Sequence, residues 1–167
     1  MKTSMLPARP LLAPLLLAAL SLPALSQSVL QPGAWERNLE GAVQDPQTGQ
    51  YRTMQSEQRR ECLTEASLKT VPYLDPAIQQ RVKGGSGDCR VADEQRSAEA
   101  ASWRMACTAA DGTRRDLRFE ATASATRFES VLHSTELPAG DPARTVHVRF
   151  QTRMTRLGEC TPGMAAP

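Results

Sequence analysis

The sequence predicts a mainly β fold: an antiparallel meander that forms a curved sheet, half-barrel or barrel of lipocalin-like size, with one short helical insertion. Three observations support this fold class. From Asp88 onward, apolar and polar residues alternate with period two, which is typical of half-buried antiparallel strands. Clusters of turn-forming residues separate the alternating segments. Helix signals outweigh strand signals only in the segment 64–82.

The first 26 residues have the three parts of a cleavable secretory signal. Lys2 and Arg9 form a positive start, Leu11–Leu22 is an apolar run, and Ala24 and Ser26 are small residues at the expected cleavage point. A membrane anchor is the alternative, but a run of about a dozen residues is shorter than the roughly 20 that a spanning helix needs. No Cys stands at the cleavage point, so we expect no lipid anchor.

We expect residues 27–160 to form a single β-rich domain, followed by a disordered tail over 161–167. The whole chain has 20 basic and 18 acidic residues, and the signal contains two of the basic ones and no acid. The mature protein is therefore close to neutral, with basic residues scattered among acids. This excludes the contiguous basic patch of a nucleic-acid-binding protein. The expected product is a periplasmic monomer without a membrane span.

The first expected elements are two strands joined by a turn. Residues 30–43 form a strand with Trp35 and Leu39 on one face, the cluster 45–49 contains Pro and Gly and turns the chain, and residues 51–58 return as a second strand.

The helical signals lie in the segment 64–82. Asp75 before Pro76 is a typical N-cap with proline at the first helical position, and Ile78 and Val82 lie one turn apart on the same face. Two glycines follow and end the segment. We expect a short helix that packs over one end of the sheet.

The next strands are expected to form a hairpin that turns around residues 97–98. This register places Cys89 opposite Cys107 and Val91 opposite Met105. The two cysteines would then form a cross-strand disulfide.

A second hairpin is expected to turn at residues 123–124, or through a longer loop in the same register. The predicted pairs are Glu120 with Arg127, Arg118 with Glu129, and Phe119 with Phe128. Opposite charges on one face and aromatic rings on the other are what a stable strand pair favours.

A third hairpin is expected to turn through residues 138–141. The predicted pairs are Glu136 with Arg144, Leu132 with Val148, Ser130 with Phe150, and His133 with His147. The resulting apolar face contains Leu117, Phe119, Phe128, Val146 and Val148.

Four cysteines in an exported chain indicate two structural disulfides. The hairpin register pairs Cys89 with Cys107, which leaves Cys62 to pair with Cys160. A metal or redox role is the alternative, but the chain has neither a Cys-x-x-Cys motif nor a cluster of Cys and His.

No catalytic, cofactor-binding or metal-binding constellation is predicted. His133 and His147, the only two histidines, would lie opposite each other and could form a metal or pH-sensitive pair, although two polar residues on a wet face explain them more simply. Trp35 and Trp103 could line a ligand cavity, but core packing is the simpler role for them.

The layout resembles a family of small exported proteobacterial proteins known as domain of unknown function 3617. The segments that carry the resemblance are Leu30–Glu36, Cys62–Thr64, Cys89, Trp103–Cys107 and Arg156–Cys160. The resemblance implies a periplasmic location and a β-rich domain with these four cysteines, and it implies no activity or site residues. The chain departs from the family in the polar segment 45–58, where the family tends to be rich in Met and Pro.

The expected function is that of a non-enzymatic binding domain, without a cofactor, for a small apolar or envelope-derived ligand held between the curved sheet and the helix. The alternative is a disulfide-stapled interaction module that binds another envelope protein through its polar face or an exposed sheet edge.

Overall fold

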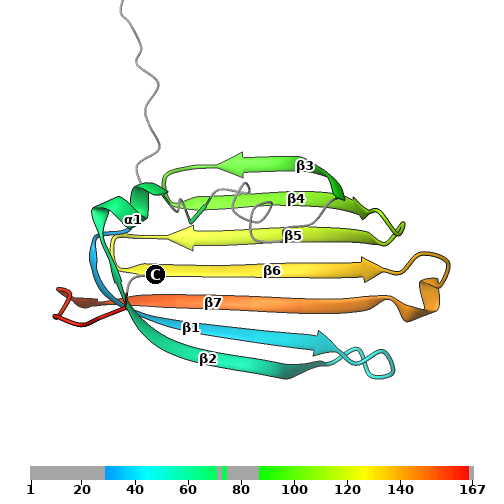
Figure 1. Cartoon of the computed structure of the whole chain (residues 1–167), viewed down its shortest axis with the longest axis horizontal. Helices are drawn as coiled ribbons and strands as arrows, with labels where there is room; N and C mark the ends of the chain where they lie inside the picture. The colour runs from blue at the N-terminus through cyan, green and yellow to red at the C-terminus, as the bar shows by residue number, and fades with distance from the viewer. Residues whose placement is uncertain (1–28, 71–72, 75–86, 166–167) are drawn as a thin grey trace, which may run out of the picture.

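A computed structural model describes residues 29–70, 73–74 and 87–165, which form one antiparallel sheet of seven strands with a short helix (Figure 1). The elements are β1 (Gly33–Gln44), β2 (Tyr51–Leu63), α1 (Glu65–Thr70), β3 (Gly87–Arg96), β4 (Ala100–Ala109), β5 (Arg114–Ala123), β6 (Arg127–Leu137), the 3-10 helix η1 (Pro142–Arg144) and β7 (Val146–Gly158). The predicted mainly β fold is confirmed.

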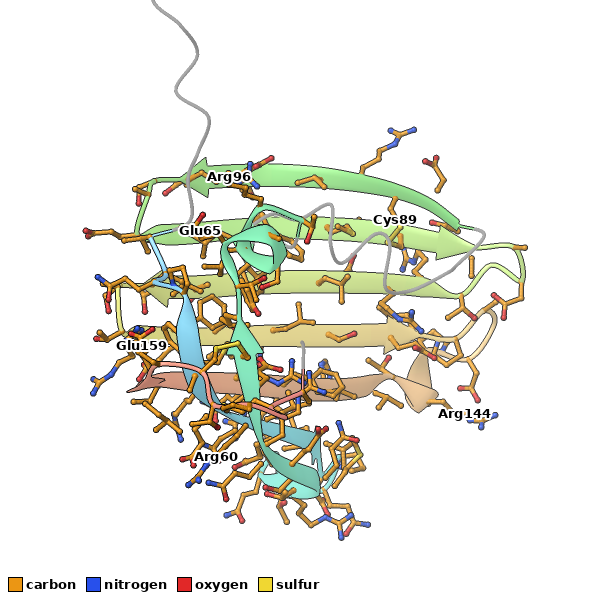
Figure 2. All side chains as sticks on the ribbon, turned by 60° about the vertical axis from the view of Figure 1, so that its left-hand side comes forward. Arg60, Glu65, Cys89, Arg96, Arg144 and Glu159 are labelled. Carbon is orange, nitrogen blue, oxygen red and sulfur yellow. A yellow bond between two sulfur atoms is a disulfide. The ribbon has the colours of Figure 1, made fainter. Side chains whose placement is uncertain are left out.

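The strand order is β2-β1-β7-β6-β5-β4-β3. Strands β3 to β7 form the predicted meander, whereas β1 lies between β2 and β7 and so joins the first hairpin to the last strand. Strands β2 and β3 form the two edges and do not pair with each other, so the sheet is open rather than a closed barrel. Strand β2 bends and carries α1, which begins at Glu65, over β4 and β5 (Figure 2).

The two faces of the sheet differ in polarity with period two. In β5, Leu117, Phe119 and Ala121 are buried, whereas the intervening Arg118 and Glu120 are exposed. We call the face toward α1 the inner face, and it carries the buried cluster of Trp35, Leu68, Trp103, Met105, Leu117, Phe119, Phe128, Leu132 and Met154. The opposite, outer face is polar.

The predicted register of the β3–β4 hairpin is confirmed in the half that is farther from the turn. Cys89 lies opposite Cys107 and Val91 lies opposite Met105. A bulge between Ala92 and Gln95 then shifts the pairing by one position. Within this bulge Asp93 has a φ of 53°, a conformation that aspartate adopts more readily than most residues.

The predicted register of the β5–β6 hairpin is wrong. Phe119 lies opposite Leu132 rather than Phe128, and the other two predicted pairs, Glu120 with Arg127 and Arg118 with Glu129, are absent as well. The chain turns at residues 125–126, because the amide of Ser124 donates to the carbonyl of Arg127 over 2.8 Å. The amide of Arg127 donates back to the Ser124 Oγ. The turn therefore lies two residues later than predicted.

The predicted register of the β6–β7 hairpin is also wrong. Leu132 lies opposite Phe150, and Glu136 lies opposite Val146. Ser130 lies opposite Thr152 rather than Phe150. The 3-10 helix η1 extends the connection, so pairing resumes only at Val146.

Helix α1 begins directly after β2 and spans six residues. The Thr64 amide donates to the Ser67 Oγ over 2.9 Å, and the Ser67 amide donates to the Thr64 Oγ1 over 3.1 Å, which is a reciprocal cap of the helix start. Leu68 anchors α1 in the core with 7% exposure. The helix start predicted at Asp75 and the segment up to Val82 lie outside the described residues, as do the signal segment 1–26 and residues 166–167.

The segment after Cys160 returns to β2. The amide of Cys62 donates to the carbonyl of Ala165 over 2.8 Å, and Ala165 forms a parallel bridge with Glu61. Within the described ranges, no helix is long and apolar enough to cross a membrane.

Candidate functional site

One end of the sheet brings together segments that are far apart in the sequence. Gly33 lies opposite Leu63, and Ala34 lies opposite both Cys62 and Gly158. The disulfide between Cys62 and Cys160, with Cα atoms 5.5 Å apart, joins β2 to the chain after β7. The second predicted disulfide, between Cys89 and Cys107, is present as well, with Cα atoms 4.1 Å apart. Both predicted pairings are confirmed.

Arg156 clips the start of β1 to the end of β7. Its Nε donates to the carbonyl of Pro32 over 2.9 Å, and its Nη2 contacts the Glu159 carboxylate over 2.7 Å. A Cβ atom on Gly33 would lie 2.3 Å from the Gly158 carbonyl oxygen and 2.8 Å from the Arg156 guanidinium. Only glycine therefore fits at position 33.

Next to this end, the inner face carries aromatic and apolar side chains. Trp35 and Met154 are 0% and 1% exposed, and the Trp35 indole donates to the Gln31 carbonyl over 3.0 Å. Phe128 lies opposite Met154, and the Tyr73 ring packs edge-on against Phe128 with centroids 5.4 Å apart. These side chains form a continuous apolar surface from β1 to β6.

Charged side chains lie at the border of this apolar surface. Glu61 lies opposite Trp35 and is 1% exposed, and its carboxylate is 3.1 Å from the Arg59 Nη2. This contact lacks hydrogen-bond geometry, so both Glu61 carboxylate oxygens are buried without a hydrogen bond. Arg37 lies opposite both Arg59 and Met154 and is partly buried.

The pKa of Tyr73 depends on burial and on the charges of this region. Burial raises the pKa of Tyr73 to about 12, and the Glu61 carboxylate also raises this pKa, whereas Arg37 and Arg59 lower it. The phenol is therefore neutral throughout the physiological range and can donate a hydrogen bond.

A partly exposed apolar strip continues from Arg37 along the inner face toward the far end of β1. We call it the inner strip, and it consists of Leu39, Val43, Val146, Val148 and Phe150. Val146 is 42% exposed and the other four are partly buried. Gly41 leaves space for Phe150, because a Cβ atom at Gly41 would lie 3.1 Å from the Phe150 ring.

Trp103 lies deeper on the inner face. It is 2% exposed and its ring stacks on Phe119 with centroids 4.9 Å apart. Its Nε1 is buried without a hydrogen-bond partner, which is uncommon for an indole N–H in a protein core. Both tryptophans thus belong to the core, as the simpler interpretation expects.

The predicted pairing of His133 with His147 is wrong, because β7 is shifted by two positions. His133 lies opposite Arg149, and its ring contacts Tyr51 edge-on at 6.5 Å. His147 lies opposite Thr135, whose Oγ1 is 3.0 Å from the His147 Nδ1. No group of three or more His, Cys, Asp or Glu that could hold a metal occurs among the residues that the structure describes.

A separate groove of about 630 Å³ lies near the start of β4 and the end of β3. Its lining includes Ser102, Glu120, Thr122, Glu129, Ser130 and Val131. The groove is open to solvent, and it includes none of the residues around Glu61. It therefore does not coincide with the apolar surface of the inner face.

The sequence interpretation did not identify Glu61, Arg59, Arg37 or Tyr73. The period-two alternation of side chains in β1 and β2 could have identified the first three. Residues that lie opposite each other in two paired strands share a face, so the residue opposite Trp35 must lie on the face of Trp35. That face carries a carboxylate at Glu61 where an apolar residue is expected. Tyr73 carried no comparable signal, because it lies outside the strands.

No curated protein and no solved structure matches the chain. A family model described as a protein of unknown function, DUF3617, matches residues 30–160. This match covers β1 to β7 and both disulfides. The structure brings three of the resembling segments, Leu30–Glu36, Cys62–Thr64 and Arg156–Cys160, together at one end of the sheet. The chain therefore belongs to the DUF3617 family.

Proposed function

We propose that the protein is an exported, non-enzymatic binding domain whose inner face takes a small apolar or envelope-derived ligand. The observation that carries the proposal is the inner strip. Its five apolar side chains remain partly exposed on the inner face of an open sheet. Contiguous exposed apolar surface is typical of a binding site.

A periplasmic location is part of this proposal. Two disulfides favour an oxidising compartment, since thiols stay reduced in the cytosol. The signal-like first 26 residues support the same location.

The non-enzymatic role is supported by the positions of the histidines. The His147 imidazole contacts the Thr135 hydroxyl, but nucleophilic catalysis also needs a third group, most often a carboxylate, that orients the base. Among the described contacts of His147, none is to a carboxylate.

The test is binding of an uncharged apolar probe, N-phenyl-1-naphthylamine, to the protein purified from periplasm, together with native mass spectrometry of the same sample. We expect saturable binding with one probe per chain, or a co-purified apolar molecule. The variant Val148→Asp should weaken probe binding at least tenfold, because it places a charge in the inner strip.

Val131→Asp is the matched control. Val131 is also a partly buried valine on a neighbouring strand, but it lies opposite Gln151 and faces outward. This variant should bind the probe as the wild type does. Neither probe binding nor a co-purified ligand in a folded wild-type protein would overturn the proposal.

A second candidate function is a module that binds another envelope protein through β2. Residues 52–60 of this edge strand are all exposed. An unpaired strand edge can accept a further strand from another protein. Photocrosslinking from position 58 in cells should then capture one defined partner. Recovery of the protein alone would contradict this role.

A further inference from the structure

Arg37 is a partly buried cation at the border of the apolar part of the inner face. It forms no ion pair with any carboxylate in the described part of the chain. Its neighbours across the sheet are Met154 on β7 and Arg59 on β2. Two like charges directly opposite each other destabilise a strand pair, so the position of Arg37 opposite Arg59 has an energetic cost.

The neighbouring charges are engaged with one another rather than with Arg37. Arg59 is engaged by Glu61 at 3.1 Å and by the exposed Glu57 at 3.8 Å. Glu36, which is adjacent to Arg37 in sequence, faces outward and pairs with Arg60 at 3.4 Å. A group that bound at Arg37 would therefore meet a guanidinium that no carboxylate of the described residues engages, beside Arg59 and its two carboxylate partners.

The apolar inner strip begins next to Arg37. Leu39 lies two residues further along β1 on the same face, and Val43 lies four residues beyond it. Phe150 and Val148 accompany them on β7. From Arg37 to Val43 the strand extends over roughly 20 Å. Arg37 therefore lies at one end of the inner strip.

We propose that this site binds an amphiphile with an anionic oxygen head group, a carboxylate or a phosphate, on Arg37 and a single apolar chain along the inner strip. The proposal deepens the proposed function and rests on it. An arginine guanidinium matches the geometry of both anions through paired N–H donors. Flexible neutral ligands gain nothing from that charge.

The test compares an anionic ligand with a neutral one of equal chain length. Palmitate and hexadecyl phosphate should bind at least tenfold more tightly than hexadecanol, as measured by displacement of N-phenyl-1-naphthylamine below the critical micelle concentrations. Arg37→Gln should weaken binding of both anions roughly tenfold and leave hexadecanol binding unchanged. Arg37→Lys should restore most of the loss, because it retains the charge.

Arg60→Gln is the matched control, since Arg60 lies on β2 but faces outward. It should bind all three ligands as the wild type does. Arg37→Gln should keep or raise the melting temperature, because it removes the repulsion with Arg59. Should this variant not fold, the comparison of Arg37→Lys and wild type with the three ligands still tests the head-group preference.

The outcomes separate the two proposals. Equal affinity for palmitate and hexadecanol, with no effect of Arg37→Gln, would overturn the head-group inference and leave ligand binding intact. Binding of none of these ligands would overturn the proposed function itself. Displacement of the anions by inorganic phosphate at equal concentration would show a site for a small free anion. This result would also overturn the proposal of an amphiphilic ligand.

Discussion

Gly33 illustrates how one residue is dictated by the strand beside it. Its φ is +141°, and a Cβ atom there would lie 2.3 Å from the Gly158 carbonyl oxygen. Gly33→Ala should therefore lower the free energy of unfolding by about 2–4 kcal/mol, from backbone strain and from the clash. Urea denaturation at neutral pH measures the change.

Gly140→Ala is the control for this variant. Gly140 also has a positive φ, +78°, but a Cβ atom there would have no neighbour within 4 Å. This variant should lose only about 1 kcal/mol, the cost of the left-handed conformation. Equal losses in the two variants would show that the close approach at Gly33 contributes nothing.

Tyr73 should make stability fall at alkaline pH. Its folded pKa of about 12 is above the ordinary value of 10.0, so between these values the unfolded chain loses the proton and the folded protein keeps it. The stabilisation is complete below pH 10 and is lost as pH rises toward 12. Tyr73→Phe should lack this part of the decline in urea denaturation across that range.

A direct titration checks the same group. Tyr51→Phe leaves Tyr73 as the sole tyrosine, since the chain has two. The phenolate absorbance of the folded variant should then rise with a midpoint near pH 12. A midpoint near 10 would contradict the burial that raises this pKa.

At the scale of single residues, the sequence predicted the two disulfides but not the charged cluster around Glu61. Cys89 and Cys107 were predictable because both lie in a short hairpin whose alternation fixes their faces. Glu61 and Arg37 were not, because their proximity depends on the pairing of β1 with β2 and of β1 with β7. Charged residues in an edge strand are ordinarily interpreted as solvent-exposed.

At the scale of elements, the faces were predictable and two registers were not. Phe119 and Phe128 both lie on the inner face as expected, although they are not paired. A slip by an even number of positions leaves every side chain on its face, so the hydrophobic pattern cannot detect it. The turn at Ser124 sets the register through hydrogen bonds, and such turns carry a weak sequence signal.

The packing of helix α1 on the sheet should depend on one buried side chain, Leu68. Six residues are too few for a stable isolated helix, and Leu68 is the residue of α1 that is buried. Leu68→Ala should lower the free energy of unfolding by about 2–3 kcal/mol. Lys69→Ala, at the neighbouring exposed position, should change it by less than about 0.5 kcal/mol. Similar effects of the two substitutions on thermal unfolding would show that α1 is not anchored through Leu68.

At the scale of the whole molecule, β1 between β2 and β7 is the feature that local patterns could not predict. Hairpin reasoning pairs only strands that follow each other, whereas β1 and β7 are separated by most of the chain. Closing such a long loop costs chain entropy. Two elements reinforce this contact, namely the Arg156 clip to Pro32 and the Cys62–Cys160 disulfide.

The two disulfides should therefore contribute unequally. Cys62 and Cys160 are separated by 98 residues and Cys89 and Cys107 by 18. On the chain-entropy account these loops correspond to about 4 to 5 and about 3 kcal/mol. The double variant Cys62→Ala/Cys160→Ala should be less stable than Cys89→Ala/Cys107→Ala by about 1.5 kcal/mol, as measured by urea denaturation of both proteins under identical conditions. A larger loss from the short-loop pair would instead place the dominant constraint within the β3–β4 hairpin, and the long-range contact between β1 and β7 would then be held by strand pairing and the Arg156 clip.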